Sequence, residues 1–86
     1  MKVIVSWSYA NARTYWSLRG WVGEPVKLVT QFQELRGLDT GTEVYILGPT
    51  RQYTDRARYA DMLDYCMYLE DVCRITLTFD DTDSWI

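Results

Sequence analysis

The sequence contains no histidine, and this absence excludes several kinds of catalytic site. Ser-His and Cys-His nucleophilic pairs need an imidazole, and only Ser-Lys or carboxylate schemes remain formally open, with no motif in their favour. Glycine is scarce as well, with five residues, and neither GxGxxG nor GxxxxGK[ST] occurs. We therefore expect no catalytic residues, no glycine-rich phosphate loop and no enzyme activity.

Cysteine is rare too, because Cys66 and Cys73 are the only two. On one helix they would lie about 10.5 Å apart along the axis, which is too far for a disulfide. We interpret both as reduced core residues, because a metal pair lacks further Cys or His ligands. Asp81 and Asp83 match the first two ligands of a calcium loop, but the chain stops at Ile86, before the others. We expect a solvated acidic tail, no metal and no cofactor.

Long hydrophobic runs are also absent. No segment approaches the roughly 20 apolar residues of a membrane-spanning helix, and the N-terminus MKVIVSWSY lacks a signal-peptide pattern. We expect a cytoplasmic protein that does not bind membranes. At 86 residues, with 48% hydrophobic and 24% charged residues, the chain is predicted to form one globular domain over residues 1–86.

Three segments are predicted to be strands. Residues 2–6 (KVIVS) and 43–47 (EVYIL) are apolar and rich in β-branched or aromatic types, as in strands buried on both faces. In residues 74–81 (RITLTFDD), Ile75, Leu77 and Phe79 alternate with polar residues. This period predicts a half-exposed strand, which we place at an edge of the sheet.

Helices are predicted between these strands. Thr54 or Asp55 is a suitable cap for a helix that runs to about Asp71 and has an apolar core-facing stripe. That stripe consists of Tyr59, Met62, Cys66, Leu69 and Cys73. A second helix is predicted in residues 24–38 from Pro25, an apolar stripe and Gly37. The alternative is that PVKLV is extended and a helix begins at Thr30, which forms a capping-box pattern with Gln33.

Residues 11–19 favour a third, short helix, with Asn11 as its cap and Gly20 as its end. The alternative is that residues 14–18 (TYWSL) form a strand. The order strand, helix, strand, helix, strand predicts an α/β domain with a small three-stranded, mainly parallel sheet and right-handed crossovers. If residues 14–18 form a strand, the fold is instead α+β with a mixed sheet.

Tyrosine and arginine are the abundant features. Aromatic residues make up 15% of the chain, eleven of the thirteen are Trp or Tyr, and seven of the nine basic residues are Arg. In a parallel sheet the carboxyl ends of the strands meet at one edge, where ligands usually bind. We expect that edge, or the outer face of the helix predicted to run to about Asp71, to form the binding surface, since Tyr and Arg are common at binding hot spots. The predicted binding residues are Tyr9, Arg13, Arg51, Tyr53, Arg56, Arg58, Tyr65 and Tyr68.

A competing interpretation assigns these charges to ordinary surface ion pairs. Arg58 can pair with Asp61 along the helix, and Arg56 and Asp55 flank its cap. Asp80 or Asp81 can neutralise Arg13 and Arg51 across the edge of the sheet. Such exposed pairs contribute only about 0 to 1 kcal/mol each and need no ligand.

The main functional hypothesis is a non-enzymatic protein-binding module, of the accessory or inhibitor type, with phage-encoded inhibitors of host defence as one example. Its partner is a protein or a second copy of the chain, as a homodimer. The alternative is a binder of small anions or nucleotides, or a weak phosphotransfer enzyme, at the carboxyl ends of the strands, where Arg13 and Arg51 hold the anion.

Nucleic acid is an unexpected partner because the net charge is −3. Residues 1–60 carry eight basic and five acidic groups, whereas residues 61–86 carry one and seven. A local Arg and Tyr strip that stacks on single strands is the variant in which nucleic acid binds. Mimicry of DNA by the acidic segment, which would occupy a basic groove on a partner, is a variant of the protein-binding hypothesis.

Overall fold

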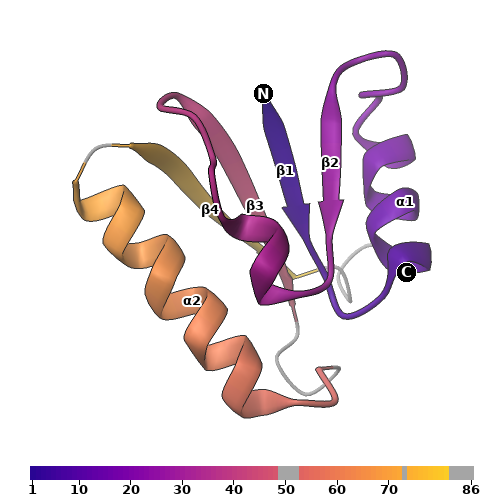
Figure 1. Cartoon of the computed structure of the whole chain (residues 1–86). Helices are drawn as coiled ribbons and strands as arrows, with labels where there is room; N and C mark the ends of the chain where they lie inside the picture. The colour runs from indigo at the N-terminus through magenta and orange to yellow at the C-terminus, as the bar shows by residue number, and fades with distance from the viewer. Residues whose placement is uncertain (49–52, 73, 82–86) are drawn as a thin grey trace.

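The computed structural model describes residues 1–48, 53–72 and 74–81, and these form a small α/β fold with one four-stranded parallel sheet (Figure 1). The elements, in chain order, are β1 (Lys2–Val5), α1 (Tyr9–Leu18), β2 (Val26–Val29), the 3₁₀ helix η1 (Phe32–Leu35), β3 (Thr42–Gly48), α2 (Arg56–Asp71) and β4 (Ile75–Asp81).

The strand order is β2-β1-β3-β4, and every neighbouring pair is parallel. The predicted α/β class is therefore confirmed, with one strand more than expected. The predicted strands at 2–6, 43–47 and 74–81 correspond to β1, β3 and β4, and β4 lies at an edge as predicted.

The extra strand is β2, where a continuous helix over residues 24–38 was the wrong prediction. Val26–Val29 pairs with Lys2–Val5 of β1, and only Phe32–Leu35 is helical. The extended alternative for this segment is the correct one, although the capping box of Thr30 and Gln33 does not form, because Gln31 caps η1 without a side-chain hydrogen bond. Val26 and Val29 are β-branched and fit a pleated strand well, and pairing with β1 outweighs the helix-like spacing of the apolar residues in this segment.

Helix α1 confirms the helical prediction for residues 11–19 and excludes a strand at 14–18. Its cap is Ser8 rather than Asn11, because the backbone N–H of Asn11 donates to the Ser8 hydroxyl at 3.2 Å. The Asn11 side chain instead accepts from the buried hydroxyl of Ser6 at 2.7 Å. Gly20 follows the helix with a φ of 73°, the left-handed conformation expected of a glycine at a helix end.

The sheet separates two hydrophobic layers. We call the side covered by α2 and η1 the aliphatic face, because its buried strand residues are Val3, Val5, Val29, Val44, Ile46 and Ile75. Helix α2 adds Tyr59, Met62, Cys66 and Leu69, which confirms four residues of the predicted stripe, while Cys73 lies outside the described residues.

The opposite side, covered by α1, is the aromatic face, because Tyr15, Trp21 and Tyr45 dominate its core together with Ile4, Ala12 and Leu47. The guanidinium carbon of Arg19 lies 5.0 to 5.9 Å from the centres of the three rings, within cation–π range. Within the described ranges neither helix is long and apolar enough to cross a membrane.

Candidate functional site

The carboxyl ends of β1 and β3 are the first place to look for a site, because the chain leaves these neighbouring strands in opposite directions and ligands often bind at such a point. Tyr53 occupies this position. Its hydroxyl donates to the carbonyl oxygen of Leu47 at 2.6 Å and lies 3.4 Å from that of Val5. The ring thus closes the gap between the two strand ends.

Tyr53 is only 6% exposed, so its expected place on an open binding surface is wrong. The ring makes an edge contact with Trp7 and lies 4.1 Å, centre to centre, from Tyr59. Burial, and to a lesser extent the neighbouring Tyr59, raises the pKa of Tyr53 well above its usual value, so the hydroxyl stays a donor at physiological pH. Tyr53 is a structural residue.

A hollow of about 190 Å³ remains beside this tyrosine. It is lined by Trp7, Thr30, Tyr53, Thr54, Asp55, Arg58 and Met62. The volume is below the roughly 300 to 1,000 Å³ of ordinary small-molecule sites. Among the described residues of this lining, the guanidinium is that of Arg58, which lies 3.4 Å from the carboxylate of Asp55.

The structure does not gather all the predicted arginines around this hollow. Arg13 is exposed on α1 and lines a separate groove with Trp16, Leu18 and Val22. Arg56 is exposed in the first turn of α2, and Arg51 lies outside the described residues. Tyr9 is exposed at the start of α1, where its hydroxyl lies 3.4 Å from both carboxylate oxygens of Glu34.

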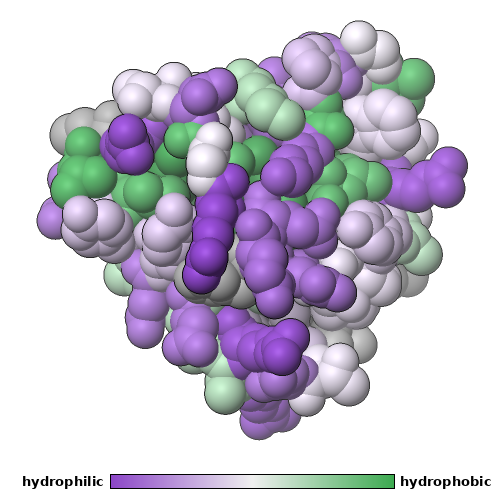
Figure 2. Space-filling view, in the orientation of Figure 1, coloured by the Kyte–Doolittle hydropathy of each residue, from purple (hydrophilic) through white to green (hydrophobic). Residues whose placement is uncertain are grey.

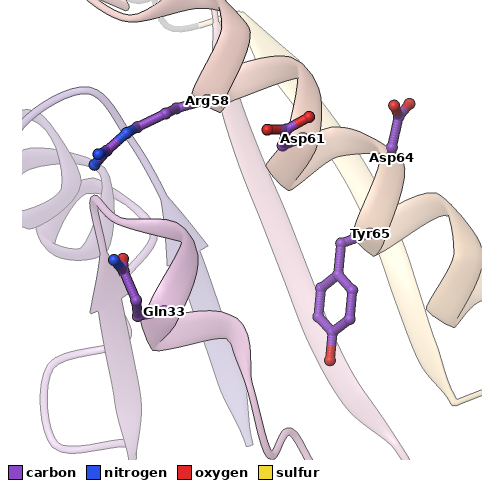
Figure 3. A pocket seen from close by; sticks show the side chains of 5 residues that line it. All are labelled: Gln33, Arg58, Asp61, Asp64 and Tyr65. Carbon is purple, nitrogen blue, oxygen red and sulfur yellow. The ribbon is translucent and has the colours of Figure 1, made fainter.

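A larger groove, of about 440 Å³, runs between η1 and α2. Its lining consists of Gln33, Arg58, Asp61, Asp64 and Tyr65 (Figure 3). In Figure 3, Tyr65 projects from α2 into the space between the two helices, Arg58 extends toward η1, and Asp64 points away from it. Of the predicted binding residues, Arg58 and Tyr65 are therefore brought together here.

The outer side of α2 continues this groove. Its residues, which we call the acidic face of α2, are Asp61, Asp64, Tyr65, Tyr68 and Asp71. Tyr65 is half-buried against the aliphatic core, whereas Tyr68 is 62% exposed and the three aspartates are exposed. Asp61, Tyr65 and Tyr68 each come one position before a core residue, and Asp64 and Asp71 lie three residues from Asp61 and Tyr68, so all five share one side of the helix.

Polarity divides this side of the molecule. Figure 2 shows hydrophobic surface mainly across the upper part of the view, while the lower part, where α2 begins in Figure 1, is mostly hydrophilic. The start of α2 carries Asp55, Arg56, Arg58 and Asp61, all exposed. The groove between η1 and α2 therefore has a charged end.

The sequence prediction did not include Gln33, which comes from η1, or the exposed Met67 and Phe79. The helical spacing from Asp61 to Tyr65 and Tyr68 was a usable signal for the acidic face. No comparable sequence signal identifies Gln33 as a groove residue, because its position depends on where β2 ends and η1 begins. Among the described residues no cluster of three or more Cys, Asp or Glu is arranged to hold a metal ion.

Comparisons with known proteins give no family for this chain. No protein-family model matches it, and neither curated proteins nor solved structures show significant similarity to it.

Proposed function

We propose that this chain is a non-enzymatic protein-binding module whose contact surface is the acidic face of α2 together with the groove beside it. The observation that carries the proposal is the groove of about 440 Å³, which has Tyr65 in its lining and two carboxylates at its border. Tyrosine supplies a large, rigid contact area with a polar tip, and it is common among the residues that dominate protein interfaces.

Charge indicates the chemistry of the partner. Asp61, Asp64 and Asp71 are exposed, and among the described residues that line the groove Arg58 is the one with a basic side chain. A lysine or arginine from a partner can place its aliphatic stem along the Tyr65 ring and its cationic head near Asp61 and Asp64. The partner is therefore a protein with a basic, solvent-exposed segment, and complementary charge accelerates its association.

The small-ligand alternative has weaker support. The hollow at the carboxyl ends of the strands is about 190 Å³, and the Tyr53 hydroxyl occupies the gap between β1 and β3. An accessory or inhibitor role, with a phage origin, rests on the small size and the composition of the chain and stays a prediction.

The test starts with affinity purification from the native host and compares two variants in an otherwise unchanged chain. Tyr68→Ala removes the most exposed tyrosine of the acidic face, while Tyr9→Ala removes an exposed tyrosine on α1 and serves as the matched control. Binding of each to the recovered partner is then measured by calorimetry. Loss of a hot-spot tyrosine costs about 2 kcal/mol or more, which is roughly 30-fold in Kd.

We expect Tyr68→Ala and the pair Asp61→Asn with Asp64→Asn to weaken binding, and Tyr9→Ala to leave it unchanged. Weakening by the aspartate pair shrinks as salt rises, because salt screens exposed charges. The proposal is wrong if Tyr68→Ala binds as tightly as the unchanged chain, or if both tyrosine variants lose the partner equally.

A further inference from the structure

The two edges of the sheet are protected to different degrees. β2 has four residues, follows Pro25 and contains Lys27, three features that discourage an edge strand from pairing with another chain. β4 has seven residues, and its first five, ITLTF, contain neither charge nor proline. By the same criteria β4 is an edge that can accept a further strand.

Apolar side chains are exposed next to this edge. Phe79 shares a side of β4 with Ile75 and Leu77, yet it is 57% exposed, and Met67 on α2 is 51% exposed. Since Arg58 and Tyr65 line the groove toward η1, the opposite flank of α2, with Leu63 and Met67, faces the β4 edge. Hydrophobic surface reaches the left margin of Figure 2, where α2 ends and β4 begins in Figure 1.

The sequence of β4 is complementary to itself when two copies run antiparallel. With Leu77 opposite its counterpart, Ile75 faces Phe79, Thr76 faces Thr78, and Arg74 faces Asp80. Directly opposite residues lie on the same face of a sheet, so this register pairs apolar with apolar, hydroxyl with hydroxyl, and cation with anion. Shifting it by two residues in one direction puts Arg74 opposite Thr78 and loses the charge pair.

We infer that the chain forms a two-fold symmetric dimer by antiparallel pairing of β4 with β4 of a second copy, centred on Leu77. The two sheets then join into one sheet of eight strands. Arg74 is exposed, and Asp80, which accepts from the Tyr15 hydroxyl at 2.9 Å, is half-buried and has further lone pairs for a second donor. Each end of the shared ladder thus has an ion pair.

The same symmetry explains the exposed apolar residues near the edge. A two-fold axis perpendicular to the sheet puts both α2 helices on one side of it, antiparallel, with their Leu63 and Met67 flanks facing each other. Arg56 and Glu70 lie near opposite ends of this flank, so each helix directs its Arg56 toward the Glu70 end of the other. Phe79 loses exposure to water in the same contact.

This dimer uses the flank of α2 opposite to the groove lined by Arg58 and Tyr65, so it does not depend on the proposed function. A dimer would carry two copies of the acidic face, and a partner with two basic segments would then bind with added avidity. Loss of partner binding and loss of the dimer are separate outcomes, because they respond to different variants.

Sedimentation equilibrium of the full chain over a concentration series tests the dimer. We expect twice the monomer mass, and about 100-fold weaker dimerisation in Phe79→Lys. Leu18→Lys, which charges an exposed leucine on α1, is the matched control and should leave the dimer intact. A monomer at every concentration up to the millimolar range, or equal behaviour of the two lysine variants, overturns the inference.

Charge exchange tests the register. Arg74→Asp alone puts two acidic residues opposite each other and should weaken the dimer, whereas Arg74→Asp with Asp80→Arg restores opposite charges and should recover it. Thermal melts of each variant separate loss of folding from loss of pairing, since Asp80 also bonds Tyr15. Failure of the double change to recover the dimer in a folded protein rules out this register.

A cross-link provides the last check. Leu77→Cys places two thiols opposite each other at the axis, within disulfide range, whereas Leu18→Cys on α1 does not. Under mild oxidation the first variant should form a covalent dimer and the second should stay monomeric on a non-reducing gel. A dimer that does not cross-link through residue 77 contradicts the pairing.

Discussion

The two faces of the sheet are held together in different ways. On the aliphatic face, α2 buries Tyr59, Met62, Cys66 and Leu69 against a row of valines and isoleucines. On the aromatic face, α1 buries only Ala12 and Tyr15 completely. One helix is therefore attached through many modest contacts, and the other through one large side chain.

The aromatic face compensates with polar contacts at the tips of its rings. The Tyr15 hydroxyl donates to Asp80 at 2.9 Å, and the indole N–H of Trp16 donates to the carbonyl oxygen of Trp21 at 2.7 Å. The Arg19 guanidinium covers the rings of Tyr15, Trp21 and Tyr45. Concentrating the attachment of α1 in Tyr15 makes this face the more sensitive to a single substitution.

Tyr15→Ala should therefore have the largest effect. Removing a ring that is 1% exposed leaves a cavity beside Trp21 and Tyr45, and such truncations cost about 3–5 kcal/mol. Urea denaturation followed by tryptophan fluorescence measures the change in the free energy of unfolding. Trp16→Ala, which truncates a partly buried neighbour, should cost less, and an equal or larger loss there would contradict the special position of Tyr15.

The second comparison uses Phe in place of two tyrosines, one from each face. Tyr53→Phe leaves the buried Leu47 carbonyl without the donor that lies 2.6 Å away, and this should cost about 2 kcal/mol. Tyr15→Phe removes a bond to Asp80, which water can partly replace because Asp80 is half-exposed, so we expect about 1 kcal/mol. Thermal unfolding of both variants under one buffer condition gives the order, and a smaller loss for Tyr53→Phe would reverse the interpretation.

The smallest expected effect is a pH dependence of the aliphatic face. Burial raises the pKa of the Cys66 thiol to about 11. Between pH 9 and 10 the unfolded chain has mostly released this proton while the folded chain keeps it, so stability falls as pH rises, by about 1 kcal/mol. Chemical denaturation at both pH values measures the fall.

Cys66→Ala removes this thiol and keeps every other titrating group, so its stability should fall less over the same interval. An identical fall in the variant and the unchanged chain would assign the effect to other groups. Above pH 10 the tyrosines contribute as well, because burial raises the pKa of Tyr15, Tyr45 and Tyr53.

Much of the fold could be predicted because its signals are local. The run Val44 to Leu47, the alternation in β4 and the apolar stripe of α2 each identify an element from adjacent residues, and Asp55 caps α2 as expected. The segment that failed is β2, where valines at positions 26 and 29 suit a helix as well as a strand. Its state is decided by pairing with β1, more than twenty residues away.

The candidate site was less predictable, because it too depends on contacts between segments that are far apart in the sequence. Tyr65 and Tyr68 could be assigned to the outer side of α2 by counting helical turns, and the structure places them there. The burial of Tyr53 could not be foreseen, because it depends on how closely the ends of β1 and β3 approach each other. The place of Gln33 in the groove lining could not be foreseen either, because it depends on η1 being a short helix of four residues.

The strand order β2-β1-β3-β4 has a consequence for how the protein is assembled during translation. Each strand, as it leaves the ribosome, finds its neighbour already made: β2 and β3 join opposite sides of β1, and β4 joins β3. No late strand has to be inserted between two that are already paired, so a nascent chain can complete its sheet from the centre outward without undoing earlier hydrogen bonds.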